Sequence, residues 1–297
     1  MSVDEQEFLT AKELAALLRV KERKVYELAS NSDLPCTRAL GKLLFPRAAV
    51  DRWLSDSGSG LDAVPAAKNR PVVMLGSHDP LLEWALRESK CGMATFFDGS
   101  LDGLDRFADG DGIGTGLHVY EPKTKTWNIT TIQQRFSNKP VVLCQWIWRE
   151  RGLIFRPEHD GKITGIADVR DLKFVPRQAE AGSQRLLEFI LQDAGIEPSK
   201  IEQTAVARTE TDAVLAVSDG TGDVTLGLQS LASQYKLRFM PMMRERFDLL
   251  IDRRAWFEES MQTFFAFCAS DVFRKRVADH GGYDSTGLGK ILFNGQV

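Results

Sequence analysis

The chain has 297 residues, of which 43% are hydrophobic, and this length exceeds what a single core usually organises, so we expect two domains. A formal net charge of −3 with 27% charged residues excludes an overall basic, nucleic-acid-coating protein, so any DNA binding must be local. The four cysteines lie far apart and show no zinc-ligand spacing, which indicates free thiols in a reducing compartment.

The N-terminal residues MSVDEQEFLTAKEL are acidic and polar, unlike a secretory signal. No stretch approaches the roughly 20 apolar residues that a membrane helix needs. We therefore expect a cytoplasmic protein with no membrane partner.

The first predicted helix begins after Thr10, which forms a capping-box pattern with Glu13. A turn at residues 19–20 leads to a second, shorter helix over residues 21–29. Val25 and its helical neighbours give this second helix one apolar face, and its other side is basic.

Two short strands and a third helix follow. Cys36–Arg38 and Leu43–Phe45 flank a segment in which Gly41 can take the positive φ of a hairpin turn, which predicts a small β-wing. Arg47–Leu54 predicts the third helix. A helix, a turn, a basic helix and a wing can place one helix in the major groove of DNA.

The segment FLTAKELAALLRVKERKVYELASNSDLPCTRALGKLLFPRAAVDRWL resembles the excisionase-like branch of the MerR-type winged helix-turn-helix fold. It departs from that pattern at Lys21, where a Ser or Thr usually caps the helix, and in the longer, more acidic run at residues 30–33. The alternative is a solvated charged surface with no DNA contact. The residues that the resemblance implies for contact with double-stranded operator DNA are Lys21, Arg23, Lys24, Tyr26, Arg38 and Lys42.

A change of composition to Ser, Gly, Asp, Pro and Ala near residue 55 predicts an interdomain linker. We expect a DNA-binding domain at residues 1–55, a linker at 56–70 and a ligand-sensing domain at 71–297.

Beyond the linker, apolar strand patterns alternate with amphipathic helix patterns, which predicts an α/β domain with parallel strands. The predicted strands are Val72–Leu75, Met93–Phe97, Gly116–Tyr120, Pro140–Trp148, Leu153–Arg156, Leu172–Val175, Val224–Gly227 and Phe247–Ile251. The predicted helices are Pro80–Glu88, Leu101–Phe107, Ser183–Ala194, Thr211–Ser218, Leu228–Tyr235 and Arg254–Asp279.

Several segments of this region, taken in order, resemble the periplasmic-binding-protein-like domain of type II, a relative of molybdate-binding proteins that bacterial regulators carry behind a helix-turn-helix. They include VVMLGSHDPLLEWAL, PVVLCQWIWRERGLIFRP and MRERFDLLIDR. The implied fold class is a small winged helix-turn-helix, mainly α with a β-wing, joined to a two-lobed α/β sensor domain. The implied function is a ligand-responsive bacterial transcriptional regulator.

Three helix starts carry the predicted ligand site: Gly76-Ser77-His78, Gly99-Ser100 and Ala181-Gly182-Ser183. Helix N-termini that converge on a cleft favour a negative group. A molybdate- or tungstate-like oxyanion would be repelled by Glu180 if that residue faces the cleft, and an anionic metabolite or cofactor held by arginines is the alternative. The predicted ligand-binding residues are Ser77, His78, Gly99, Ser100, Thr115, Arg177, Gln178, Gly182, Ser183 and Arg246.

The sequence does not favour catalysis. Ser77, His78 and Asp79 are neighbours and cannot reach the mutual geometry of a catalytic triad. The histidines show no metal-ligand spacing. We expect no enzyme activity, no cofactor and no metal.

The hypothesis for the mechanism is that ligand closes the two lobes about residues 140–149 and 238–247. Closure would alter the spacing of paired N-terminal domains on an operator, so we expect a homodimer. Two alternatives remain open: a binding component of an uptake system, and an excisionase-like architectural or recombination factor without ligand sensing.

Overall fold

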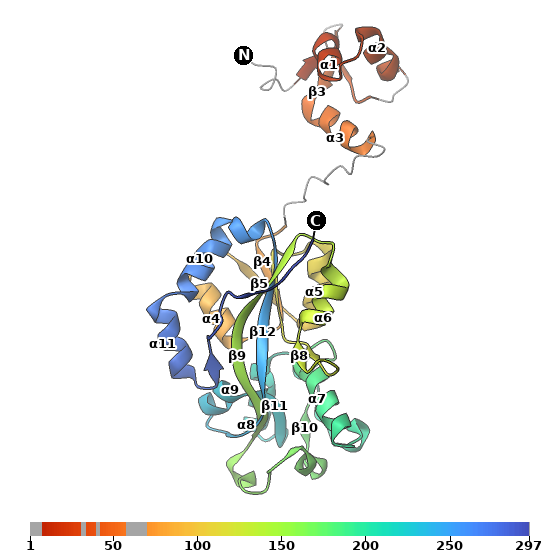
Figure 1. Cartoon of the computed structure of the whole chain (residues 1–297). Coiled ribbons are helices and arrows are strands. Elements are labelled where there is room, and N and C mark those ends of the chain that lie inside the picture. The colour runs from red at the N-terminus through yellow and green to blue at the C-terminus, as the bar shows by residue number, and fades with distance from the viewer. Residues whose placement is uncertain (1–7, 31–33, 40–41, 58–69, 297) are drawn as a thin grey trace. The chain divides into compact units, whose positions relative to one another are not determined.

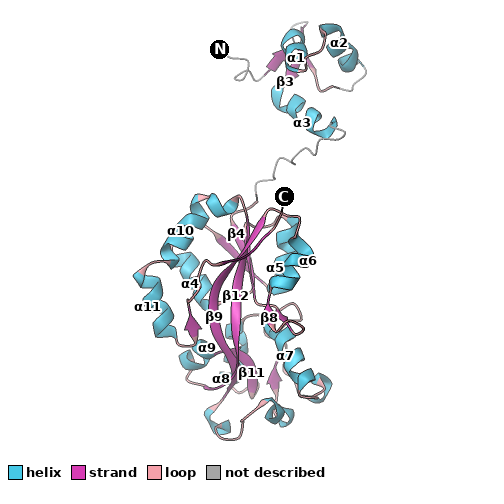
Figure 2. Cartoon of the chain, in the orientation of Figure 1, coloured by secondary structure: helices cyan, strands magenta, loops and turns pink. Residues whose placement is uncertain are grey.

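The computed structural model describes residues 8–30, 34–39, 42–57 and 70–296. The chain divides into two compact units, residues 1–69 and 70–297, which Figures 1 and 2 label by element. The predicted linker at 56–70 lies mainly outside the described residues, and the helix before it continues to Ser57, beyond the predicted end at Leu54.

The first unit packs three helices on a small antiparallel sheet of order β1-β3-β2. Its elements are β1 (Phe8–Thr10), α1 (Ala11–Leu17), α2 (Glu22–Ser30), β2 (Thr37–Ala39), β3 (Lys42–Pro46) and α3 (Arg47–Ser57). The predicted capping box forms: the Thr10 hydroxyl accepts from the Glu13 amide at 3.3 Å, and the Glu13 carboxylate accepts from the Thr10 amide at 2.8 Å. The predicted turn at Gly41 lies outside the described residues.

The core of this unit is formed by apolar side chains from β1, β3 and the three helices. Leu9, Leu14, Val25, Phe45 and Val50 are all fully buried. Because Val25 of α2 is buried in this core, the opposite face of α2 is exposed to solvent.

The second unit is built on one nine-stranded mixed sheet, with the order β10-β11-β9-β12-β6-β4-β5 and with β13 and β14 also paired to β9. The strands are β4 (Val73–Gly76), β5 (Ala94–Phe97), β6 (Gly114–Leu117), β9 (Val141–Phe155), β10 (Phe174–Val175), β11 (Val224–Leu228), β12 (Arg238–Asp252), β13 (Tyr283–Asp284) and β14 (Ile291–Asn294). A hairpin of β7 (Tyr120–Glu121) and β8 (Thr126–Trp127) stands apart. The predicted parallel pairing holds for β4, β5 and β6 and for β10 with β11, but β9 and β12 run antiparallel to all their neighbours, so the prediction is wrong for these two strands.

Strands β9 and β12 are each 15 residues long and pair along their whole length, and Figure 1 shows them running through both halves of the unit. The prediction broke the first of them at residues 149–152 and recognised only the end of the second. The break was placed wrongly because Gly152 serves close packing here: a Cβ at Gly152 would lie 2.0 Å from the Met240 carbonyl oxygen.

The helices cover the two lobes that the long strands connect. They are α4 (Pro80–Glu88), α5 (Ser100–Asp109), α6 (Ile129–Phe136), α7 (Gly182–Asp193), α8 (Glu210–Ser218), α9 (Gln229–Gln234), α10 (Glu259–Cys268) and α11 (Asp271–His280). We call the part with β4–β6, α4–α6, α10 and α11 lobe 1, and the part with β10, β11 and α7–α9 lobe 2.

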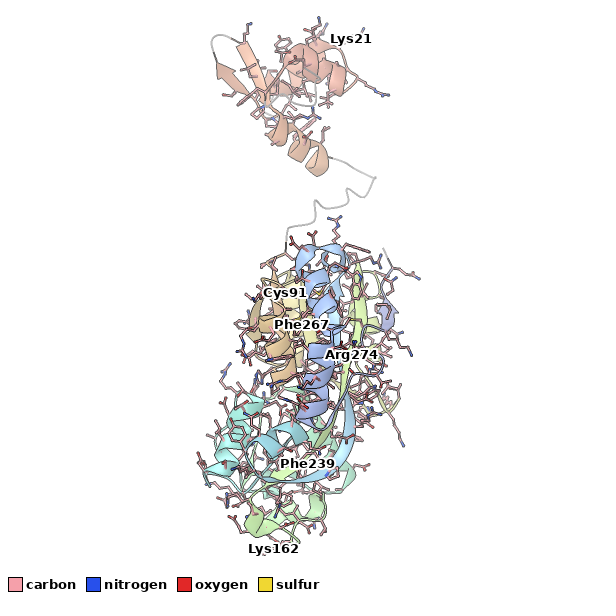
Figure 3. The ribbon with its side chains drawn as sticks, turned by 90° about the vertical axis from the view of Figure 1, so that its left-hand side faces the viewer. Lys21, Cys91, Lys162, Phe239, Phe267 and Arg274 are labelled. Atoms are coloured by element: carbon pink, nitrogen blue, oxygen red, sulfur yellow. The ribbon has the colours of Figure 1, made fainter. Side chains whose placement is uncertain are left out.

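Two helical predictions differ from the structure. Helix α6 was not predicted, and the single helix expected over Arg254–Asp279 is two helices, α10 and α11. The second begins afresh because the Ser270 hydroxyl accepts from the Phe273 amide and caps it. Figure 3 shows this pair, with Phe267 on α10 and Arg274 on α11.

Candidate functional site

The exposed face of α2 carries the predicted DNA-contacting residues. Lys21, Arg23, Lys24 and Tyr26 are all exposed, and the Tyr26 side chain keeps 52% of its surface in solvent. Lys24 donates to Glu27 at 2.7 Å, one turn along the helix. The arrangement leaves a basic and aromatic face that no part of the described first unit covers.

The wing, formed by β2 and β3, carries the other two predicted DNA-contacting residues. Lys42 is exposed at the start of β3. Arg38 lies on β2, but its side chain falls outside the described residues.

On lobe 1, the ends of β4 and β6 and the start of α5 bring together a buried polar group. Ser77 follows β4 and Ser100 opens α5, and their hydroxyl oxygens lie 2.7 Å apart. The His118 amide, just after β6, donates to the Ser100 hydroxyl at 3.2 Å. Ser77 is 3% exposed and Ser100 is fully buried, so solvent does not reach this group.

Lobe 2 packs directly on this group through the segment before α7. The Leu101 amide at the start of α5 donates to the Glu180 carbonyl oxygen at 3.2 Å. Gly182 lies against His118: a Cβ there would be 2.8 Å from the His118 ring. We call this contact region the lobe junction. The structure thus brings Ser77, Gly99, Ser100 and Gly182 together there, although the binding role of these residues stays a prediction.

A second contact between the lobes lies beside the junction. The Gln178 amide donates to the Asp98 carbonyl oxygen, and Arg208 pairs with the Asp98 carboxylate at 2.5 Å. Asp98 belongs to lobe 1, whereas Gln178 and Arg208 belong to lobe 2.

A buried network of charges runs from lobe 1 through the long strands to lobe 2. Arg149 on β9 bonds Asp79 at 2.7 Å and Glu245 on β12 at 2.8 Å. Arg151 bonds Glu245 at 2.7 Å and Glu210, the first residue of α8, at 3.0 Å.

Further polar side chains complete this network. Arg177 lies 3.3 Å from Glu210, and the Tyr283 hydroxyl donates to Asp79 at 2.9 Å. The His118 ring bonds Glu245. Every ionisable group of the network except Tyr283 is buried, so each charge depends on its partners.

Nearby arginines keep the Glu245 and Glu210 carboxylates of this network ionised. Burial raises the pKa of Glu245, but the charges of Arg149 and Arg151 outweigh it and hold the pKa well below its usual value. In the same way, burial raises the pKa of Glu210, and Arg151 and Arg177 outweigh it and lower the pKa to about 2. Burial also lowers the pKa of His118, against the opposing charge of Glu245, which favours a neutral imidazole.

The charges of the network balance within the protein. Three arginines, Arg149, Arg151 and Arg177, face three carboxylates, Asp79, Glu210 and Glu245. An anion at the lobe junction would therefore find no surplus cation among these residues.

The sequence held a signal for this network that the prediction missed. Arg149 and Arg151 point to the same face of a strand whose neighbours are almost all buried and apolar. Buried charges require partners, so such a pair predicts acidic residues elsewhere in the fold. Glu245, in the run MRERFDLL, is the matching signal on β12.

Three predicted ligand residues have other partners or places. His78 precedes α4, and its Nε2 lies 3.2 Å from Glu83 in the first turn of that helix. The Thr115 side chain is buried in β6, and its hydroxyl oxygen would lie 2.5 Å from a Cβ at either Gly76 or Gly103.

Arg246 has partners inside the protein, and its predicted role in ligand binding stays a prediction. Its Nε donates to the Asp248 carboxylate at 3.0 Å and its Nη2 donates to the Trp127 carbonyl oxygen at 2.7 Å. Burial raises the pKa of Asp248 to about 7 in spite of Arg246 and of Asn128, which donates to the same carboxylate at 2.7 Å.

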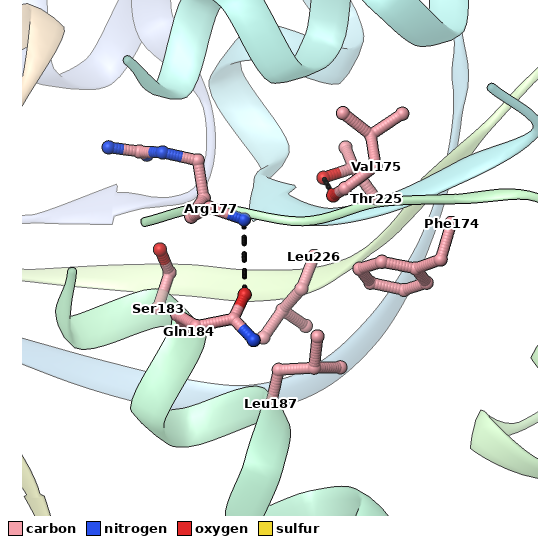
Figure 4. Close-up of a pocket in the computed structure, with 8 residues that line it drawn as sticks. All are labelled: Phe174, Val175, Arg177, Ser183, Gln184, Leu187, Thr225 and Leu226. Atoms are coloured by element: carbon pink, nitrogen blue, oxygen red, sulfur yellow. Dashed lines mark hydrogen bonds between the residues drawn. The ribbon is translucent and has the colours of Figure 1, made fainter. Parts of the chain in front are cut away.

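Arg177 and Ser183 line a narrow hollow next to the junction, shown in Figure 4. The Arg177 amide donates to the Gln184 side-chain oxygen at 3.0 Å. The hollow has no room for a water-sized sphere. The Ser183 hydroxyl is buried and has no hydrogen-bond partner among the residues that the structure describes.

Comparison with known proteins assigns both units. Residues 8–57 match the model of the helix-turn-helix domain, and residues 83–269 match that of the PBP superfamily domain. Neither is a family of enzymes. The uncharacterized protein YvgK of Bacillus subtilis (strain 168) is 23% identical over 310 residues, which cover 98% of this chain and 99% of YvgK. Within the described residues, no helix is long and apolar enough to cross a membrane.

Solved structures share the fold at low identity. An H2O2-bound OxyR mutant from Corynebacterium glutamicum has a TM-score of 0.51 and 13% identity, over 97% of this chain and 93% of that one. The tungstate ABC transporter structure from Geobacter sulfurreducens has a TM-score of 0.50 and 11% identity, over 70% of this chain and 97% of that one. The regulatory domain of MetR, a LysR family regulator from N. meningitidis, has a TM-score of 0.50 and 11% identity, over 71% of this chain and 97% of that one.

These findings confirm the predicted fold class, a helix-turn-helix unit followed by a two-lobed α/β unit of the periplasmic-binding-protein type. The PBP model covers more than half of the chain. The chain therefore belongs to the PBP superfamily and carries a helix-turn-helix domain at its N-terminal end.

Proposed function

We propose that this protein is a cytoplasmic transcriptional regulator that binds operator DNA through its first unit and a small anionic ligand at the lobe junction of its second unit. The observation that carries the proposal is the presence of a helix-turn-helix domain and a PBP superfamily domain in one chain. The first type of domain reads DNA, and the second type binds small molecules.

The exposed face of α2 supports the DNA-binding part. Arg23 and Tyr26 are three residues apart on the exposed side of the helix, whereas Val25 is fully buried. A helix held in this way can enter the major groove while Lys21 and Lys42 contact phosphates. Because phosphate contacts release counterions, binding should weaken steeply as salt rises.

The start of α7 supports the anionic ligand. Ala181 provides no side-chain cap, so the first amides of this helix, at Gly182 and Ser183, have no side-chain acceptor from it. The buried Ser183 hydroxyl adds a donor that has no partner in the described part of the chain. Because the hollow beside Ser183 has no free space in this structure, the lobes must move apart before oxygen atoms of an oxyanion or of an anionic metabolite can satisfy these donors.

The long strands support a route from ligand to DNA. Strands β9 and β12 are the structural link between the lobes, and they carry the predicted hinge segments at 140–149 and 238–247. A homodimer would place two first units on a two-fold operator, and movement of the lobes would change their spacing.

A ligand screen followed by DNA binding tests the proposal. Molybdate, tungstate, sulfate, phosphate and common anionic metabolites are added to the full chain, and the melting temperature is measured, because a bound ligand raises it by mass action. Any ligand found this way is then added to a fluorescence-anisotropy titration with duplex DNA from upstream of the gene.

We expect one ligand that raises the melting temperature and also changes the DNA affinity. Ser183→Ala should reduce the ligand effect, whereas Ser233→Ala, at an exposed position of α9, should not. DNA binding that no ligand alters would favour the architectural alternative. No DNA binding at low ionic strength would refute the proposal.

A further inference from the structure

Asp98 occupies a distinctive position between the lobes. It lies in the loop from β5 to α5, and lobe 2 approaches it with two donors, the Arg208 guanidinium and the Gln178 side-chain amide. Next to it, the Leu101 amide at the N-terminus of α5 is taken by the Glu180 carbonyl oxygen of lobe 2. Acceptors that belong to the protein therefore occupy each of these donors.

Arg208 differs from the other arginines around the junction in its exposure. Arg149, Arg151, Arg177 and Arg246 are all buried and bound to buried carboxylates. The Arg208 side chain is 73% exposed, and its carboxylate partner Asp98 is 29% exposed.

This exposure decides which arginine a ligand can recruit. Taking a partner from a buried arginine would leave a buried charge uncompensated, which is expensive. An exposed ion pair is screened by solvent and contributes little free energy, so exchanging Asp98 for another anion on Arg208 costs little. Arg208 is therefore the cation that an anion arriving at the junction can bind.

We propose that the Asp98 carboxylate is an internal competitor for the ligand, and that Arg208 and Gln178 bind the anionic oxygen group of the ligand when Asp98 is displaced. The inference rests on the proposed function, since it assigns residues to the same ligand site. It moves the anion-recognising arginine from Arg177 and Arg246 to Arg208. It also makes release of the Asp98 contact part of ligand entry.

The test uses the full chain and inorganic phosphate as the probe of the Arg208 subsite. Asp98→Asn removes the competing charge and leaves Arg208 available, so phosphate affinity measured by calorimetry at low ionic strength should rise about 1.4- to 5-fold, as expected for an exposed pair. The same substitution should speed hydrogen exchange of the Leu101 amide. In the double variant Asp98→Asn/Arg208→Ala, the gain in phosphate affinity should disappear.

The chain offers a matched control on α11. Asp271 and Arg274 form an exposed pair of the same kind at 2.6 Å, but within one helix and away from the lobe junction. Asp271→Asn changes the net charge by the same amount and should leave phosphate affinity and Leu101 exchange unchanged.

The outcomes separate this inference from the proposed function. If Asp98→Asn binds phosphate no more tightly than Asp271→Asn, Asp98 is not a competitor, whatever happens to Leu101 exchange. A gain that persists in the double variant would equally overturn the role of Arg208. Neither comparison involves DNA, so a failure of ligand to affect DNA binding would count against the proposed function alone.

Discussion

Glu245 is the centre of the buried charge network, and replacing it with glutamine tests the account of that network. The carboxylate bonds Arg149, Arg151 and His118. In Glu245→Gln, the three buried arginines of the network face only two carboxylates, those of Asp79 and Glu210. One positive charge is therefore left uncompensated. Removing one partner of a buried pair typically costs about 3–5 kcal/mol. Because glutamine retains a hydrogen-bonding oxygen, we expect a loss at the lower end, about 3 kcal/mol.

Urea unfolding followed by tryptophan fluorescence measures this loss, since five of the six tryptophans lie in the second unit. The control is Glu202→Gln, whose partner Lys173 lies 3.9 Å away in an exposed pair, and it should cost less than about 1 kcal/mol. The folded-state pKa of Glu245 is lowered, so its stabilisation is complete above the unfolded value of 4.5 and is lost as pH falls below it. Two results would contradict the central role of Glu245. One is a loss of unfolding free energy below about 1 kcal/mol at neutral pH, and the other is a difference between wild type and variant that does not shrink in acid.

Three other predictions address separate parts of the molecule. Arg23→Ala should reduce the salt dependence of duplex binding by about 0.9 in the log–log slope, as measured by anisotropy, while Lys12→Ala on α1 should not. Gly182→Ala should destabilise the second unit by about 1–3 kcal/mol in urea, since its Cβ meets His118, unlike the open position of Gly165→Ala. The raised pKa of Asp248 makes the wild-type unfolding free energy fall as pH rises from about 4 to about 7, and Asp248→Asn should abolish that fall in the same urea assay.

Local signals were enough to predict much of the fold. The capping box needs only Thr10 and Glu13, which lie within four consecutive residues, and it is present in the structure. The starts of α4 and α7 were also predicted to within a residue or so, because glycine, serine and proline mark them. Features of this kind need no information from distant parts of the chain.

The long strands could not be predicted in this way. Arg149 and Arg151 interrupt an apolar run, and they are compatible with a buried strand only because Asp79 and Glu210 reach them from other elements. Those partners are separated from them by 70 and 59 residues in the sequence. Hydrophobic periodicity carries no information about such pairings.

In the candidate site, too, local features could be predicted from the sequence and contacts between distant residues could not. Ser77 and Ser100 were predicted because each follows a strand and starts a helical segment. The contact of Asp98 with Arg208 was not, since 110 residues separate them and exposed charges of this type are common on any surface. The sequence predicts Arg246 as a ligand-binding arginine, and the structure adds Asp248, two residues on, as its partner.

The continuity of β9 and β12 determines how the two lobes can move. The lobes are joined by a paired ribbon in which almost every residue from 238 to 252 is hydrogen-bonded in register, so no loop is available as a pivot. Rotation of one lobe against the other must bend this ribbon, and bending is easiest at the register irregularities between Pro241 and Met243 and between Phe247 and Asp248. The ribbon therefore acts as an elastic element whose stiffness sets how much binding energy a given rotation consumes. Substitutions at those irregularities should shift the concentration at which ligand acts while leaving every ligand-contacting atom in place.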